Sequence, residues 1–209
     1  MLVVQDLVYH PAATPRPILQ GVTLSLGARQ LGIIVGPSGS GKSTLLEILA
    51  GFAQWQAGSI YWHSEELLPE QLGQICGLVF QFPERHFCGS TVLEELRLGH
   101  PRLSHEEIQG ALGAVGLGDV NLDTAPQSLS GGQQRRLALA VQLIRHPSVL
   151  LLDEPTAGLD WSMRRQIVQL LTQLKQEWML LVVTHEPEEL LPIADRAWQI
   201  RGGVVTPLK

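Results

Sequence analysis

The chain has 209 residues, of which 44% are hydrophobic and 17% are charged, and its formal net charge is −5. This length allows one sizeable core but is short for two full domains, and the composition is that of a folded chain rather than a disordered or fibrous one. Because the balance is acidic and no dense run of lysine and arginine occurs, we expect no nucleic acid as a partner.

The chain also carries no obvious targeting or membrane-spanning segment. The N-terminal Met1–Asp6 has no basic region leading into an apolar stretch, and apolar runs such as 149–152 and 179–183 are far below the roughly 18 residues of a membrane span. Cys76 and Cys88 lack metal-type spacing, which favours two reduced thiols. We therefore expect a soluble, cytoplasmic chain that forms no membrane path by itself.

The first part of the chain predicts strands around a loop and a helix. Residues 2–8 and 18–26 are rich in Val, Ile, Leu and Thr and are separated by prolines, which is typical of two strands joined by a stiff loop. The apolar strand 31–35 leads into a glycine-rich loop, and 42–50 has helical spacing with Gly51 as its stop. Further strands are predicted at 59–62 and 75–80.

The pattern is then helical from about residue 82 to residue 145, with helices predicted at 91–98, 105–115 and 130–145. Ser104 and Glu107 have the spacing of a capping box. Strand and helix alternate after that: strand 149–152, helix 163–175, strand 179–184, helix 188–194 and strand 197–200. The predicted fold class is α/β, with a parallel-sheet core, an N-terminal antiparallel β-subdomain and an α-helical insertion near 84–146, all in one domain, 1–209.

The glycine-rich loop reads Gly36-Pro37-Ser38-Gly39-Ser40-Gly41-Lys42-Ser43, which is the spacing of a phosphate-binding loop. Its backbone N–H groups and the following helix N-terminus would hold nucleotide phosphates. Lys42 would reach the β- and γ-phosphates, Ser43 would ligate Mg²⁺, and Thr44 would contact the α-phosphate. The loop alone indicates ATP or GTP, and its alternative is an ordinary turn before a helix.

Polar side chains follow three other predicted strands and are expected at the same carboxyl edge of the sheet, where α/β folds bind ligands. Asp153 would hold Mg²⁺ through water, and Glu154 would orient or deprotonate the attacking water. Gln81 could contact Mg²⁺ or that water, and His185 lies in register with them. The structural alternatives are an acidic turn, a polar strand end and a surface histidine.

A pentapeptide after the helical region reads Leu129-Ser130-Gly131-Gly132-Gln133 and resembles the signature of the ATP-binding-cassette (ABC) family. All the motifs occur in the order of that family, so essentially the whole chain resembles an ABC ATPase. The resemblance implies a P-loop NTPase core that binds ATP and Mg²⁺. It also implies that Lys42, Gln81, Glu154 and His185 catalyse the hydrolysis of ATP.

The resemblance further assigns roles that the residues alone do not. His185 would contact the γ-phosphate, and Gln81 would lie in a loop that faces a transmembrane partner. The signature at 129–133 would close over ATP held by a second subunit, with Asp160 connecting the two sites across the interface. Tyr9 is the candidate for stacking on adenine.

Finer resemblances point to two subgroups. The run Val79-Phe80-Gln81-Phe82-Pro83-Glu84, followed by Thr91-Val92, resembles ATPases of the energy-coupling-factor group, which power the uptake of vitamins and transition metals; His86 stands where that group often has Gln. Residues 81–87, 135–141 and 158–161 also resemble the soluble, non-intrinsic ABC proteins of cyanobacteria and plastids.

The leading hypothesis is therefore the ATPase subunit of an ABC transporter. It would form a homodimer, or a heterodimer with a related ABC ATPase, and associate peripherally with the membrane through a separate transmembrane subunit. The alternative is a soluble, non-transport ABC ATPase in an assembly process such as iron–sulfur cluster biogenesis. DNA-maintenance relatives place a long coiled coil between the two motifs, and the stretch between Ser43 and Leu129 is too short for one. Translation relatives carry two cassettes in one chain, whereas this chain has one. Both classes therefore fit poorly.

Overall fold

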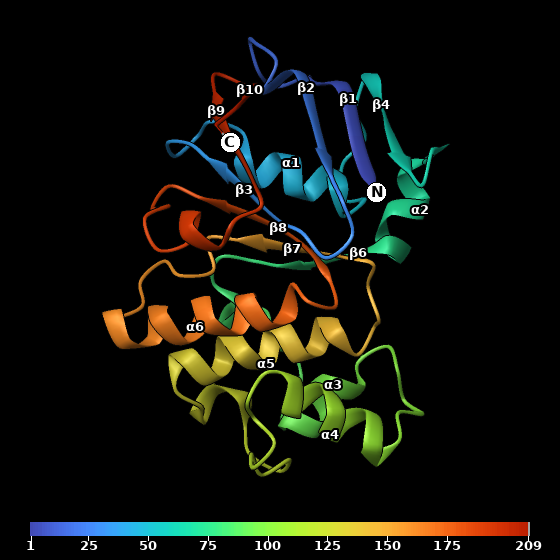
Figure 1. Ribbon diagram of the computed structural model, residues 1–209. Coiled ribbons are helices and arrows are strands. Elements are labelled where there is room, and N and C mark those ends of the chain that lie inside the picture. Colours follow the sequence, from blue (N-terminus) through green and yellow to red (C-terminus); the bar gives the residue numbers. More distant parts are fainter. Residues whose placement is uncertain (209) are drawn as a thin grey trace.

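The computed structural model describes residues 1–208 and places helix α1 (Lys42–Leu49) between two β-sheets (Figure 1). The larger sheet has the strand order β10-β9-β3-β8-β7-β6. Its strands are β3 Leu31–Val35, β6 Cys76–Val79, β7 Val149–Asp153, β8 Met179–Thr184, β9 Arg196–Arg201 and β10 Val204–Pro207. All neighbours are parallel except β9 and β10, which confirms the predicted α/β class with a mainly parallel sheet.

The central strands are buried on both faces, as their continuous apolar runs predict. On β7, Leu150 and Leu152 pack against the outer helices, whereas Val149 and Leu151 pack toward α1. This division follows from the two-residue period of a strand. Two hydrophobic cores therefore hold the sheet between them and fix the positions of the strand ends.

The smaller sheet is antiparallel, with the order β2-β1-β4-β5, as the N-terminal β-subdomain was expected to be. Its strands are β1 Leu2–Tyr9, β2 Leu19–Leu26, β4 Ala57–Trp62 and β5 Glu65–Glu66. Leu45, Leu46 and Leu49 of α1 are buried in the core that the two sheets share. This packing determines the direction in which the N-terminus of α1 points.

The remaining helices lie mostly on the other face of the larger sheet, where Figure 1 shows α5 and α6 beside each other and α3 and α4 beyond α5. The helices are α2 Pro69–Ile75, α3 Val92–Arg97, α4 His105–Ala114, α5 Gly131–Leu143 and α6 Trp161–Leu174, with short 3₁₀ turns η1 Pro83–Arg85, η2 Pro126–Ser128 and η3 Leu191–Ile193. The capping box predicted for α4 is present, because Ser104 N–H donates to Glu107 at 2.8 Å and Glu107 N–H donates to Ser104 Oγ at 3.2 Å.

Four elements differ from the sequence prediction. The helix expected at 188–194 is wrong: a turn at Pro187 leads only to the short η3, because Pro192 has no N–H and cannot continue an α-helix. Helix α2 and strands β5 and β10 were not predicted. Helix α2 begins with Pro69, a residue favoured at the first helical position.

Two further properties concern the described residues 1–208 as a whole. No helix in this range is long and apolar enough to cross a bilayer. Cys76 and Cys88 are free thiols, the first buried and the second exposed, and burial raises the pKa of Cys76 to about 12. The Cys76 thiol is therefore a packing group with little thiolate character.

Candidate functional site

The predicted phosphate loop connects the end of β3 to the start of α1. Gly39 and Gly41 have φ angles of 76° and 101°, a backbone conformation that favours glycine. Gly41 is the N-cap of α1 and no side chain caps that helix, so the first N–H groups of α1 have no side-chain acceptor. Such a helix start is a favourable position for an anion.

A cavity of about 430 Å³ lies over this loop, which is within the usual size range of ligand pockets. It is lined by Ile18, Ser38, Gly39, Gly41, Lys42, Ser43, Thr44, Gln81, Glu154 and His185. The fold therefore brings most of the loop together with the predicted Gln81, Glu154 and His185. These side chains come from segments that follow four different strands.

Lys42 is only 6% exposed and has three oxygen neighbours. Its Nζ donates to the carbonyl oxygens of Gly36 at 2.8 Å and Pro37 at 3.2 Å, and lies 3.5 Å from Glu154 Oε1. Two backbone carbonyl oxygens and one carboxylate thus hold the ammonium group beside the loop. A phosphate with more negative charge could replace the carboxylate.

Glu154 is 5% exposed, and its carboxylate is fixed from several sides. Oε2 accepts hydrogen bonds from Thr184 Oγ1 at 2.9 Å and from the His185 N–H at 3.2 Å, and Oε1 lies 2.8 Å from His185 Nδ1. The backbone of Glu154 has a φ of 49°, which is uncommon for a residue with a side chain. The carboxylate is therefore directed into the cavity rather than toward solvent.

Asp153, at the end of β7, has the properties of a cation ligand. Its Oδ1 is buried without a hydrogen-bond partner, and the hydroxyl of Ser43 lies beside its carboxyl group. Burial raises the pKa of Asp153 above its ordinary value, and the negative charge of Glu154 raises it further. Ser43 and Lys42 lower this pKa but do not cancel the effect of burial. A desolvated carboxylate oxygen beside a hydroxyl fits a hard divalent cation such as Mg²⁺.

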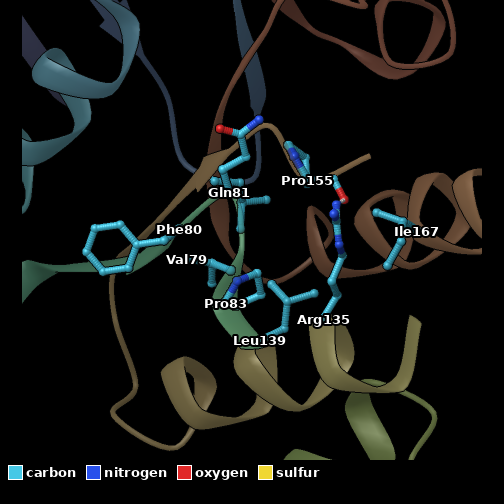
Figure 2. A pocket seen from close by; sticks show the side chains of 9 residues that line it. Val79, Phe80, Gln81, Pro83, Arg135, Leu139, Pro155 and Ile167 are labelled. Atoms are coloured by element: carbon cyan, nitrogen blue, oxygen red, sulfur yellow. Dashed lines mark hydrogen bonds between the residues drawn. The ribbon is translucent and has the colours of Figure 1, made fainter. Parts of the chain in front are cut away.

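Gln81 follows β6 at the entrance of the helical region. Figure 2 shows its amide directed away from Val79 and Leu139, which line a small neighbouring hollow together with Pro83 and Ile167. Gln81 also lines the larger cavity beside Glu154. It thus lies where the phosphate cavity meets the helical layer.

Arg135 of α5 is a site-related residue that motif reasoning did not single out. Figure 2 shows it rising from α5 toward Pro155. Arg135 is only 8% exposed. Its guanidinium group donates to the carbonyl oxygens of Glu154 at 3.4 Å, Pro155 at 2.6 Å and Ala157. Burial is the main reason that its pKa is lowered from the ordinary arginine value. Arg135 therefore fixes the turn that carries Glu154 against the helix that begins at the signature.

We expect Arg135→Ala to lower the free energy of unfolding by about 3 kcal/mol, because buried carbonyl groups would lose a charged donor. In thermal unfolding this corresponds to a midpoint roughly 6–12 °C lower. Arg136→Ala is the matched control, since the Arg136 side chain donates only at 3.3 and 3.4 Å to Gly132 and Gly116. Equal midpoints for the two variants would show that Arg135 does not support this turn.

The signature pentapeptide lies outside this cavity. Ser130 and Gln133 form a capping box at the start of α5, with hydrogen bonds of 3.3 and 2.9 Å. Asp160 caps the neighbouring α6 by accepting from Met163 N–H at 2.9 Å. A Cβ atom on Gly132 would lie 3.2 Å from the Met163 sulfur, so the two helix starts are adjacent. Both belong to one face of the chain, apart from its own phosphate loop.

Tyr9 is not among the residues that line the cavity. It ends β1, where its carbonyl accepts the N–H of Ile18 at 2.8 Å, and its side chain packs against the core that includes the buried residues of α1. Ile18, which sequence reasoning did not propose, lines the cavity instead. Adenine stacking on Tyr9 stays a prediction.

Comparisons with known proteins agree with this geometry. The ABC transporter family profile matches residues 19–157. The chain is 44% identical to ABC transporter I family member 11, chloroplastic, of Arabidopsis thaliana, over 97% of this chain and 78% of that protein. It is 34% identical to the energy-coupling factor transporter ATP-binding protein EcfA2 of Acetivibrio thermocellus, over 88% of this chain and 70% of that protein.

One solved structure extends the likeness to three dimensions. CbiO1 of Clostridium perfringens, described as part of the ABC transporter complex cbiONQ, superposes with a TM-score of 0.89 at 27% identity. The superposition covers 98% of this chain and 86% of that one.

Proposed function

This chain belongs to the ABC transporter family as an ATP-binding subunit with ATPase activity, and from that premise we propose that it hydrolyses Mg²⁺–ATP in a dimer to drive a separate transmembrane partner. The observation that carries the proposal is the grouping of Lys42, Gln81, Glu154 and His185 around the phosphate loop. These side chains supply a cation, a water-orienting carboxylate and two polar contacts in one cavity.

In this proposal the phosphate loop and Lys42 bind the β- and γ-phosphates of ATP. The γ-phosphate takes the place of the Glu154 carboxylate beside Lys42, and Glu154 then orients the attacking water and accepts its proton. His185, which lies 2.8 Å from Glu154, holds that carboxylate and contacts the γ-phosphate. Ser43, Asp153 and Gln81 would hold Mg²⁺, which neutralises developing charge on the phosphates.

The position of the signature supports a dimer. The N–H groups at the start of α5 and the hydroxyl of Ser130 lie apart from the chain's own phosphate loop, so they could complete the site only in a second subunit. We propose that two subunits enclose two ATP molecules, with Asp160 at the contact between them. Tyr9 remains our candidate beside adenine, now together with Ile18.

The surface next to Gln81 supports a protein partner. Phe52 is 67% exposed and stacks with Phe80 at 6.3 Å, and Phe80 stacks with His86 at 4.7 Å. A hollow of about 110 Å³ beside them is lined by Phe80, Pro83, His86 and Phe87 among others. Exposed aromatic groups around a hollow are typical of docking surfaces. We propose that a transmembrane subunit docks here and brings the chain to the membrane.

For the class of cargo we rely on what the relatives' names say that they transport. One relative, 37% identical, is the thiamine import ATP-binding protein ThiQ of a Ruegeria species, and others are energy-coupling factor ATPases. We propose uptake of a vitamin or a transition metal. We also propose that residues 1–209 form one ATPase domain, with residues near 84–146 as its helical subdomain.

Capture of partners tests this proposal. We expect tagged Glu154→Gln chain, incubated with ATP and Mg²⁺ in membranes and cytosol of the native host, to retain a multi-span membrane protein that mass spectrometry identifies. Phe80→Ala together with Phe52→Ala should lose that protein but keep ATP binding, because these residues lie outside the phosphate cavity. Recovery of a soluble partner alone would contradict the transporter proposal and favour the assembly ATPase.

A further inference from the structure

Arg164 of α6 connects two segments that flank the phosphate cavity. Its Nε donates to the carbonyl oxygen of Leu159 at 2.9 Å, and its Nη1 lies 2.7 Å from Glu186 Oε2. Leu159 directly precedes Asp160, and Glu186 directly follows His185. One guanidinium group thus contacts both the turn before α6 and the loop after β8.

The contacts continue from Glu186 into the catalytic residues. Glu186 Oε1 lies 3.7 Å from His185 Nε2, and the opposite ring nitrogen of His185 lies 2.8 Å from Glu154. The Glu186 N–H also donates to Thr184 Oγ1 at 3.0 Å, and that hydroxyl donates to Glu154. Glu186 therefore contacts both groups that hold the Glu154 carboxylate.

We propose that Arg164 and Glu186 are positioning residues, which link the turn at Leu159 and Asp160 to His185 and Glu154. The attacking water is then aligned only when this turn has the position described above. The inference rests on the proposed function, because that function places Asp160 at the contact with a second subunit. Closure of the dimer would then be sensed at Leu159 and carried through Arg164 and Glu186 to the catalytic carboxylate.

An arginine suits this role better than a lysine. The two contacts come from two different nitrogens of one planar group, so a shift of Leu159 must move the nitrogen that faces Glu186. The adjacent Arg165 makes no such link and instead lies over the ring of the exposed Trp161, 4.7 Å from its centre. Arg165 is therefore a matched control of the same type, on the same helix.

The test is steady-state ATP hydrolysis by purified full-length variants. We expect Arg164→Gln to lower kcat at least tenfold with KM for ATP changed less than about twofold, because misalignment at the reacting atoms costs rate rather than binding. The Arg164 and Glu186 side chains are 27% and 40% exposed, so their ion pair contributes little to folding, and the thermal midpoint should fall by less than about 3 °C.

Four further variants test the linkage: Arg165→Gln, Arg164→Lys, Glu186→Gln, and Arg164→Gln combined with Glu186→Gln. Arg165→Gln should retain wild-type kcat. Arg164→Lys should show a loss close to that of Arg164→Gln, since a single nitrogen cannot occupy both positions. Arg164→Gln combined with Glu186→Gln should be no slower than the slower single variant, because both would interrupt one linkage.

Wild-type kcat in Arg164→Gln would overturn the inference, as would an equal loss in Arg165→Gln, a raised KM without a change in kcat, or a loss of kcat matched by unfolding. These outcomes differ from failure of the proposed function itself. In that case the wild-type chain would not hydrolyse ATP, or Glu154→Gln would hydrolyse it at the wild-type rate.

Discussion

Glu154→Gln is expected to slow ATP hydrolysis about a thousandfold while the chain still binds ATP. The amide keeps the size of the side chain and its contacts with Thr184 and His185, but it can no longer accept a proton from water. It also removes the carboxylate that lies 3.5 Å from Lys42 Nζ, so the γ-phosphate meets less repulsion. The nucleotide-bound dimer should therefore accumulate.

The rate of ATP hydrolysis is measured by phosphate release, and the amount of dimer by size-exclusion chromatography with ATP and Mg²⁺. Glu177→Gln is the control, because Glu177 is exposed in the turn that follows α6 and lies outside the cavity. Hydrolysis by Glu154→Gln at the rate of this control would remove Glu154 from the proposed mechanism. A monomer at saturating ATP would contradict the enclosed dimer but leave the role of the carboxylate in place.

Lys42→Ala should weaken ATP binding about a hundredfold, which corresponds to roughly 2.7 kcal/mol. The ammonium group of Lys42 is buried and already desolvated, so its contact with phosphate oxygens is strong compared with an exposed ion pair. Isothermal titration calorimetry of the purified variant with ATP measures the change. Binding of AMP should change far less, since it lacks the β- and γ-phosphates.

The control for Lys42→Ala addresses its structural contacts. Lys42 also donates to Gly36 and Pro37, so the variant's thermal midpoint without nucleotide must be compared with that of the wild type. A folded variant with unchanged ATP affinity would refute the phosphate-loop assignment.

Some residues of the site lie in local sequence motifs and could be predicted, whereas others take part only through tertiary contacts. The phosphate loop, Asp153-Glu154 and His185 could be predicted because each follows a recognisable apolar strand, and parallel strands bring their carboxyl ends together. Arg135 and Arg164 act through carbonyl oxygens and an ion pair set by tertiary packing, and no local pattern marks them. Ile18 is a further example, since an apolar residue before a strand has no signal of its own.

The fold shows the same division. The central strands were predicted correctly because burial on both faces produces continuous apolar runs, and α1 because its apolar residues have helical spacing. The helix expected at 188–194 is absent because Pro192 has no N–H to donate within an α-helix. Strand β10 was missed because it is an edge strand, with Val204 exposed and only Val205 packed against the core. Its pairing with β9 provides hydrogen bonds that composition does not signal.

The helix starts differ in one respect that bears on the lifetime of the chain. Thr91, Ser104, Ser130 and Asp160 cap helices α3 to α6 with their own side chains, whereas α1 begins at Gly41 with none. Bound phosphate completes that missing cap, so nucleotide is in effect part of the folded structure. A ligand at a hundred times its dissociation constant adds about 2.7 kcal/mol to stability. Resistance of the chain to proteolysis should therefore rise with the concentration of any nucleotide whose phosphates occupy this helix start.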